Sequence, residues 1–210
     1  MKLTAISDTH GFPIPIKSCD VLVHAGDATQ LGTESEVRAF FEWFVQTPAK
    51  HRIFVPGNHD FGFENHRAMF RAMVPEGVTL LIDESVIIDD HKFYGSPWSP
   101  QFNDWAFNLR TSEQLRDCWD MIPEDTDVLI THAPPRGILD KTQDRYDKLG
   151  ENAGCRALAE RVRVVKPKVH IFGHIHSGYG SRDLDGTLYV NASTCTERYK
   201  PTNAPCMVVL

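Results

Sequence analysis

The chain has 210 residues, of which 41% are apolar and 24% are charged, and this composition suits one compact domain with a core large enough to fold alone. It excludes a disordered tail and a small scaffold stapled by disulfides. The net charge is −6 and no dense run of Lys and Arg appears, so a long nucleic acid is a poor partner. A small anionic substrate is compatible if metal ions supply the positive charge. We therefore expect residues 1–210 to form a single domain.

Targeting and redox features favour the cytoplasm. No apolar run approaches the roughly 18 to 20 residues that a transmembrane helix needs, and the first charges come too early for a signal peptide. The sequence therefore predicts a cytoplasmic protein that does not contact a membrane. The five cysteines are scattered and none forms a C-x-x-C pair, so neither a disulfide framework nor a zinc knuckle is expected. The oligomeric state is not indicated.

The first sixty residues alternate between predicted strands and helices. Short apolar runs rich in β-branched residues predict buried strands at 3–7, 21–25 and 52–55. Apolar residues recur with helical spacing over 33–47, where Thr33 and Glu36 form the T-x-x-E pattern of a capping box. A further helix is expected at 64–73.

The rest of the chain begins with a strand-rich stretch and then alternates again. A helix beginning at Thr111 is expected, with Gln114 completing a second capping box. Two segments, 95–109 and 133–153, are long and irregular, which is typical of functional or mobile loops. The remaining strands are expected at 78–82, 86–88, 128–131, 169–172 and 188–190, and the remaining helix at 157–165. This order predicts two α/β halves whose sheets pack on each other.

Five short polar motifs each follow a predicted strand. They are D-T-H at 8–10, G-D at 26–27, G-N-H-D at 57–60, T-H at 131–132 and G-H-I-H at 173–176. The loops at the carboxyl ends of parallel strands converge on one crevice, so these motifs are expected to form one site. The candidate metal ligands are Asp8, His10, Asp27, Asn58, His132, His174 and His176.

The chemistry of these side chains points to two metal ions. Seven oxygen and nitrogen ligands without a cysteine are too many for one tetrahedral zinc, which takes three or four. They fit two ions of higher coordination held about 3.5 to 4 Å apart and bridged by a carboxylate, an arrangement used for displacement at phosphorus. Imidazoles mixed with carboxylate and amide oxygens favour Mn, Fe or Zn over Ca or Mg. The glycines before the ligands are expected to let the backbone turn sharply.

The order D-x-H, G-D, G-N-H-D, H and G-H-x-H over residues 8–176 resembles the calcineurin-like metallophosphoesterases. Four further segments resemble one branch, the metallophosphoesterase-domain-containing proteins, which are similar to class III phosphodiesterases. These segments are Gly95-Ser96-Pro97-Trp98, Trp105-Ala106-Phe107-Asn108, Thr131-His132-Ala133-Pro134-Pro135 and Asn191-Ala192-Ser193-Thr194.

The resemblance implies a fold and a division of the ligands. The fold would be a four-layer α/β/β/α sandwich. One metal would be held by Asp8, His10 and His176, and the other by Asn58, His132 and His174. Asp27 would bridge the two. Mn²⁺ is the expected ion, with Fe or Zn as alternatives.

The resemblance also implies an activity. His59 would bind no metal. His59 would face the substrate beside Asn58, where it neutralises the phosphoryl oxygens or protonates the leaving group, and Asp60 would orient it. The reaction would be hydrolysis of a small phosphodiester, such as a 2′,3′- or 3′,5′-cyclic nucleotide, by hydroxide activated at the metals.

Three other functions remain open from the sequence. A phosphomonoesterase or protein phosphatase on the same scaffold would place cationic side chains around the terminal phosphate, and none lies within the ligand motifs. A catalytically idle module that binds metals to shape a recognition surface would have no need of His59 and Asp60. A nuclease acting on polymers fits poorly with the acidic charge.

Several residues have two interpretations. The histidines outside the ligand pattern are expected on the surface or in the core, with His24 alone as a support for the ligands: His24, His51, His66, His91 and His170. One aromatic group either stacks on a base or aryl leaving group or forms a local core: Trp98, Phe102, Trp105 and Phe107. One basic group either screens substrate charge or belongs to a solvated loop: Arg136, Lys141, Arg145 and Lys148. Asn191 and Ser193 either support the ligands or cap a turn.

Overall fold

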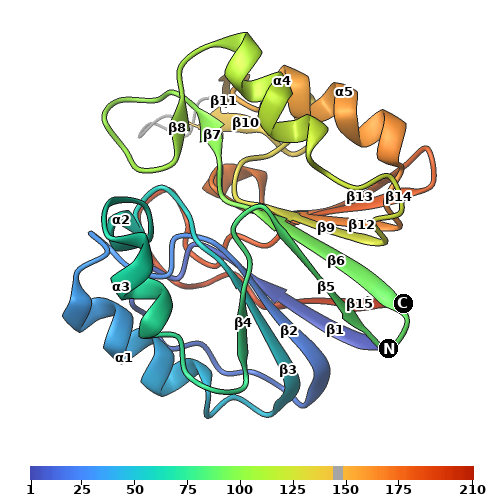
Figure 1. The fold of residues 1–210 in the computed structure, drawn as a ribbon. Coiled ribbons are helices and arrows are strands. Elements are labelled where there is room, and N and C mark those ends of the chain that lie inside the picture. Colours follow the sequence, from blue (N-terminus) through green and yellow to red (C-terminus); the bar gives the residue numbers. More distant parts are fainter. Residues whose placement is uncertain (144–148) are drawn as a thin grey trace.

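The computed structural model describes residues 1–143 and 149–210. Two β-sheets lie face to face, and helices cover the outer face of each sheet (Figure 1). The layers therefore follow the order α/β/β/α, which confirms the predicted fold class. Within the described residues, no helix has the length and apolar content to cross a membrane.

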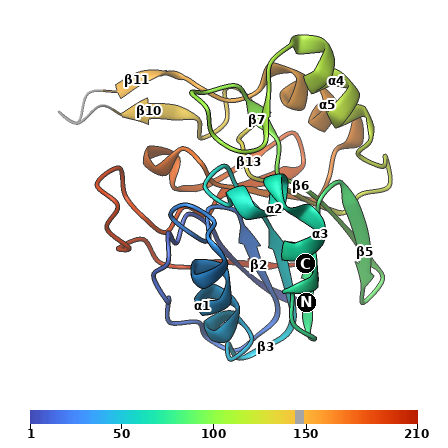
Figure 2. The same ribbon diagram turned by 60° about the vertical axis from the view of Figure 1, so that its left-hand side comes forward.

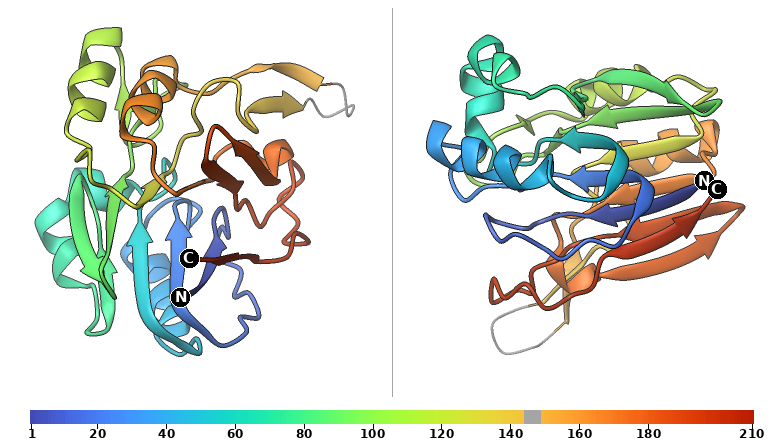
Figure 3. Two further views of the ribbon diagram at one scale, coloured as in Figure 1. Left: turned by 90° about the vertical axis from the view of Figure 1, so that its right-hand side faces the viewer. Right: turned by 90° about the horizontal axis from the view of Figure 1, so that it is seen from below.

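The first sheet carries the amino-terminal motifs. Its strand order is β15-β1-β2-β3-β4, and β1 to β4 run parallel. The strands are β15 (Cys206–Val209), β1 (Lys2–Ile6), β2 (Cys19–Ala25), β3 (Ala49–Val55) and β4 (Val78–Leu80). The sequence did not predict β15, which pairs antiparallel with β1. This pairing brings the chain ends together, and the amine of Met1 donates to the carbonyl of Leu210 over 2.8 Å (Figure 3).

The second sheet carries the carboxy-terminal motifs. Its order is β13-β14-β12-β9-β6-β5, with a parallel centre and an antiparallel strand at each edge. The strands are β13 (Gly180–Leu184), β14 (Thr187–Asn191), β12 (Val169–Phe172), β9 (Val128–Thr131), β6 (His91–Ser96) and β5 (Glu84–Ile88). The stretch from 78 to 95 has no helix, as predicted.

Helices α1 (Glu34–Phe44), α2 (Phe61–Asn65) and α3 (Arg67–Ala72) cover the first sheet. The capping box at Thr33 is confirmed. The single helix expected at 64–73 is wrong, because the backbone leaves the helical region at His66 (φ −134°, ψ 46°). The ring of Phe70 then packs against Gly62, where an added Cβ would lie 2.0 Å from that ring, so the chain must turn between the two short helices.

Helices α4 (Ser112–Asp120) and α5 (Arg156–Val165) cover the second sheet, and the capping box at Thr111 is confirmed. Each central strand is apolar on both faces. On β2, Val21 and Val23 pack between the sheets, while Leu22 packs under the helices. This double burial explains why the strands read as continuous apolar runs instead of alternating ones.

The two segments expected to be irregular contain short strand pairs that flank the site. In the first, β7 (Ser99–Pro100) pairs with β8 (Asn108–Leu109). In the second, β10 (Lys141–Gln143) pairs with β11 (Leu149–Asn152), and this pair projects from the body of the molecule (Figure 2). A 3₁₀ turn, η1 (His176–Gly178), follows β12.

The buried ring of His170 makes the fold sensitive to acid. Its Nε2 lies 2.9 Å from the hydroxyl of Thr131, which itself donates to the carbonyl of Ala133, so Nε2 carries the proton. No partner faces its Nδ1 among the described residues. Burial therefore lowers the pKa of His170 to about 3. The unfolded chain binds a proton near pH 6.5 and the folded chain does not, so this contribution to stability is complete above that pH and is lost below it.

We expect the free energy of unfolding of the wild type to lose about 2 kcal/mol through His170 alone between about pH 7.5 and pH 5.0. His170→Gln keeps a donor for Thr131 but cannot titrate. Urea unfolding of both proteins at the two pH values should show the smaller acid loss in the variant. Equal losses would show that His170 is charged in the folded protein.

Candidate metal centre

The five motifs come together at the carboxyl ends of β1, β2, β3, β9 and β12, as parallel strands require. Their side chains form groups in which the donor atoms lie within 4.8 Å of one another. The first group is Asp8, His10 and His176, and a second is Asp27, His132 and His174. These groups match the two halves of the expected ligand set, apart from Asn58.

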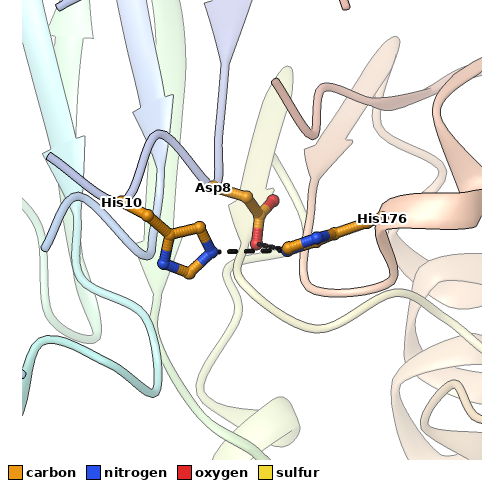
Figure 4. A group of neighbouring side chains, drawn as sticks. All are labelled: Asp8, His10 and His176. Atoms are coloured by element: carbon orange, nitrogen blue, oxygen red, sulfur yellow. Dashed lines mark hydrogen bonds and ion pairs between the residues drawn. The ribbon is translucent and has the colours of Figure 1, made fainter. Parts of the chain in front are cut away.

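The side chains of the first group point toward one another (Figure 4). Nδ1 of His10 lies 3.3 Å from the carbonyl of Thr29, and Nδ1 of His176 lies 3.0 Å from that of Thr196. Each Nδ1 must donate because a carbonyl only accepts, so both Nε2 atoms carry lone pairs when the rings are neutral. These two Nε2 atoms are 3.4 Å apart, and His176 Nε2 is 3.4 Å from Asp8 Oδ1. A cation between them would satisfy all three atoms.

The second group has the same character. Nδ1 of His132 lies 3.0 Å from the carbonyl of Ala25, which leaves Nε2 toward the site. That Nε2 is 2.8 Å from Asn58 Oδ1 and 3.4 Å from Asp27 Oδ2. The centroids of the His174 and His132 rings are 5.0 Å apart. Asn58 therefore adds an amide oxygen to this group, and the donor set fits a divalent ion with mixed oxygen and nitrogen ligands.

The charges of the two carboxylates favour a cation in each group. Burial alone would lower the pKa of His132, but Asp27, Asp8 and the carbonyl of Ala25 together outweigh it and raise that pKa to about 9. Burial is likewise outweighed at His176, where Asp8 raises the pKa to about 9. A metal ion at the same positions would satisfy the same carboxylates, in place of the protons.

Asp27 links residues of the first and second groups. It belongs to the second group and also to a third group with His10, a member of the first, and His59. Its Oδ1 accepts the backbone N–H of His59 over 2.8 Å, which fixes the carboxylate.

All three motif glycines make room for ligands, and at Gly26 a Cβ would lie 2.3 Å from Nδ1 of His132. Only Gly26 has the positive φ (102°) that the expected sharp turns would require. At Gly57 a Cβ would lie 2.3 Å from Asp27 Oδ1, and at Gly173 it would lie 2.1 Å from Asp8 Oδ2. The role expected for Gly57 and Gly173 is therefore corrected. These glycines allow the carboxylates to lie close to the backbone, and they are not needed for a left-handed turn.

Residues from other loops hold Asp8 in place. Oγ of Ser193 lies 2.8 Å from both Asp8 Oδ2 and Asn191 Oδ1, so its one proton is shared between these two acceptors. The backbone N–H of His174 lies 3.1 Å from both oxygens of Asp8. Of the two roles left open for Asn191 and Ser193, the hydrogen bonds favour support of a ligand. His24 supports the loops instead, since it pairs with the hydroxyl of Thr9.

Comparison with known proteins decides the family. The family model described as Calcineurin-like phosphoesterase matches residues 1–178. The chain belongs to this family. It is therefore a metal-dependent phosphoric ester hydrolase, and its donor groups agree with a divalent metal centre.

The relatives also confirm the resemblance to the metallophosphoesterase-domain-containing branch. The chain is 38% identical over 234 residues to human Metallophosphoesterase domain-containing protein 1, covering 100% of the chain and 71% of that protein. A UPF0046 protein of Caenorhabditis elegans is 35% identical over 212 residues, covering 94% of the chain and 71% of its own length. Among solved structures, TT1561 of Thermus thermophilus shares the fold with a TM-score of 0.60 at 13% identity, over 90% of this chain and 88% of that one.

His59 of this phosphoesterase lies beside both metal groups. Its Nδ1 donates to the carbonyl of Gln30 over 2.7 Å, and its Nε2 lies 4.0 Å from Asp27 Oδ2. The indole of Trp105 covers the ring, with centroids 4.1 Å apart and planes at 31°. His59 also belongs to the third donor group, with His10 and Asp27, whereas the resemblance implied that His59 is free of metal.

Within the described residues, no hydrogen bond joins Asp60 to the His59 ring, so the orienting role implied for Asp60 is corrected. Its Oδ1 accepts the hydroxyl of Thr29 over 2.7 Å and the backbone N–H of Thr29 over 3.1 Å. Its Oδ2 accepts the N–H groups of Gly57 over 2.8 Å and Ala28 over 3.3 Å. Asp60 thus ties together the loops after β2 and β3, and the carbonyl of Gln30 orients His59 in its place.

A cavity of about 440 Å³ opens over the metal groups. Its polar lining outside the ligands includes Gln101, Thr142, Gln143 and Glu197. Tyr199 also lines it and was missed by the sequence analysis. The centroid of its ring lies 4.7 Å from the centroid of the His10 ring. The backbone of Tyr199 is in the left-handed region (φ 53°).

The aromatic group divides between the two roles that the sequence left open for it. Trp98 and Phe107 pack into the outer cores, whereas Phe102 and Trp105 line the cavity. The guanidinium of Arg136 donates to the carbonyl of Asn152 and lines a different pocket. Arg145 and Lys148 lie outside the described residues.

Proposed function

We propose that this phosphoesterase is a dinuclear phosphodiesterase that hydrolyses small phosphodiesters and uses Mn²⁺. The observation that carries the proposal is the lining of the cavity, which holds no Lys or Arg in the part of the chain that the structure describes. A phosphomonoester is close to a dianion at neutral pH, since its second pKa is about 6, whereas a diester keeps one negative charge. Among the described lining residues, positive charge can come only from the metal centre and its histidines, which suits the diester.

The ligands would divide between two ions as the donor groups do. One ion would be held by Asp8, His10 and His176, and the other by Asn58, His132 and His174, with Asp27 bridging. Divalent ions at such a centre act as Lewis acids and lower the pKa of a water ligand, which is the chemistry that hydrolysis of a phosphoester needs.

His59 would supply the proton for the leaving oxygen. Because its Nδ1–H is committed to the Gln30 carbonyl, only Nε2 can exchange a proton with the substrate. The ring must therefore be doubly protonated before the transfer and neutral after it. Trp105 limits the movement of the ring by covering one face.

The diester preference is tested by the ratio of turnover on bis-p-nitrophenyl phosphate to turnover on p-nitrophenyl phosphate. The protein is stripped of metal and reloaded with Mn²⁺. We expect a ratio well above one, which would justify a screen of 2′,3′- and 3′,5′-cyclic nucleotides. A ratio well below one would assign a phosphomonoesterase, and no metal-dependent turnover on either ester would contradict both assignments.

A further inference from the structure

The cavity over the metal centre has an aromatic wall beside the residues that would act at phosphorus. Phe102 and Trp105 come from the loop between β7 and β8, and Tyr199 comes from the loop after β14. Phe102 is 61% exposed and makes no ring contact with another aromatic side chain in the described part of the chain. A phenyl ring held open to water beside a reaction centre offers an apolar surface to a ligand.

The loop that carries Phe102 is fixed by its backbone. The side-chain amide of Asn108 donates to the carbonyls of Phe102 over 3.2 Å and Asn103 over 3.3 Å, while its oxygen accepts the hydroxyl of Ser99 over 3.1 Å. The N–H of Ala106 donates to the carbonyl of Asn58 over 3.1 Å, which ties the loop to the metal centre. The backbone position of Phe102 is therefore set before a ligand arrives, so binding has to order only its side chain.

We propose that Phe102 and Trp105 form a stacking subsite for a planar aromatic ring carried by an ester group of the substrate. The ring is a nucleobase or an aryl group, because both have the π-face that stacking requires. The side-chain amides of Gln101 and Gln143 line the same cavity and can donate to and accept from the edge of a base. This inference rests on the proposed phosphoesterase site and names the class of substrate that it takes.

The subsite is tested with phosphonates, whose phosphorus–carbon bond is not hydrolysed. Binding of methylphosphonate and of phenylphosphonate to the Mn²⁺-loaded protein is measured by calorimetry. We expect phenylphosphonate to bind about tenfold more tightly than methylphosphonate. Phe102→Ala should bring the ratio of the two affinities close to one, whereas Phe102→Trp should keep it.

A matched control is Ile87→Ala, which truncates a side chain that is 67% exposed on β5 and should leave the ratio of affinities as in the wild type. A wild-type ratio near one, or the same ratio in Phe102→Ala as in the wild type, would overturn the subsite. Failure of the diester preference would leave these measurements interpretable, because they do not depend on turnover.

A third ligand distinguishes the two sources of the ring. The methylenephosphonate analogue of adenosine 5′-monophosphate carries a base in place of the phenyl group. Tighter binding than phenylphosphonate, lost in Phe102→Ala, would assign a nucleobase. Weaker binding, with the phenyl preference intact, would assign an aryl ester.

Discussion

Asp27→Ala is expected to abolish stable binding of both metal ions and to reduce turnover on the order of a thousandfold. The reason is that its carboxylate lies in two donor groups at once, so its loss removes a ligand from each ion and leaves buried imidazoles without the negative charge that favours a cation. Metal content is measured by mass spectrometry after gel filtration of Mn²⁺-loaded protein, alongside turnover on bis-p-nitrophenyl phosphate.

A matched control lies on β2, the strand that Asp27 follows. Asp20→Ala removes a carboxylate from the other end of β2, where it pairs with Lys50 at the surface over 2.6 Å. Ion pairs at the surface contribute little to the stability of the fold. Metal content and turnover of Asp20→Ala should therefore stay as in the wild type. An Asp27→Ala protein that still held two ions per chain would remove the bridging role.

His59→Ala is expected to keep both metal ions and to lose about a hundredfold or more in turnover on esters with poor leaving groups. The backbone N–H that binds Asp27 is unchanged by the substitution, so the metal centre keeps that contact. The loss should be large for methyl phenyl phosphate and small for methyl p-nitrophenyl phosphate, because p-nitrophenolate leaves without needing a proton.

The comparison of the two esters separates acid catalysis from metal binding. Equal losses on both esters would remove the acid role of His59. Loss of metal from the variant would instead place His59 among the ligands, as its membership of a group with His10 and Asp27 allows.

The sequence predicted the fold wherever local signals and burial agree. The capping boxes at Thr33 and Thr111 are local hydrogen-bond patterns, and the structure contains both. The motif residues came together because each follows a parallel strand. The break at His66 was missed because it follows from packing of Phe70 on Gly62, a contact that helical periodicity does not encode.

Parts of the site depend on contacts between distant segments, and these were not visible in the sequence. Tyr199 reaches the ring of His10 because β15 carries the end of the chain back beside β1. Asp60 accepts the backbone N–H of Thr29, which lies in another loop. Because Asp60 follows His59 in the chain, the sequence suggested a contact with His59 instead. The carbonyl that orients His59 belongs to Gln30, and a backbone group leaves no residue-type signal.

The two-metal centre is tested most directly by a crystal structure of the Mn²⁺-loaded protein with anomalous diffraction data. We expect two anomalous peaks about 3.5 to 4 Å apart, with the carboxylate of Asp27 between them. A single peak in either donor group, or two peaks that do not share Asp27, would contradict the dinuclear centre.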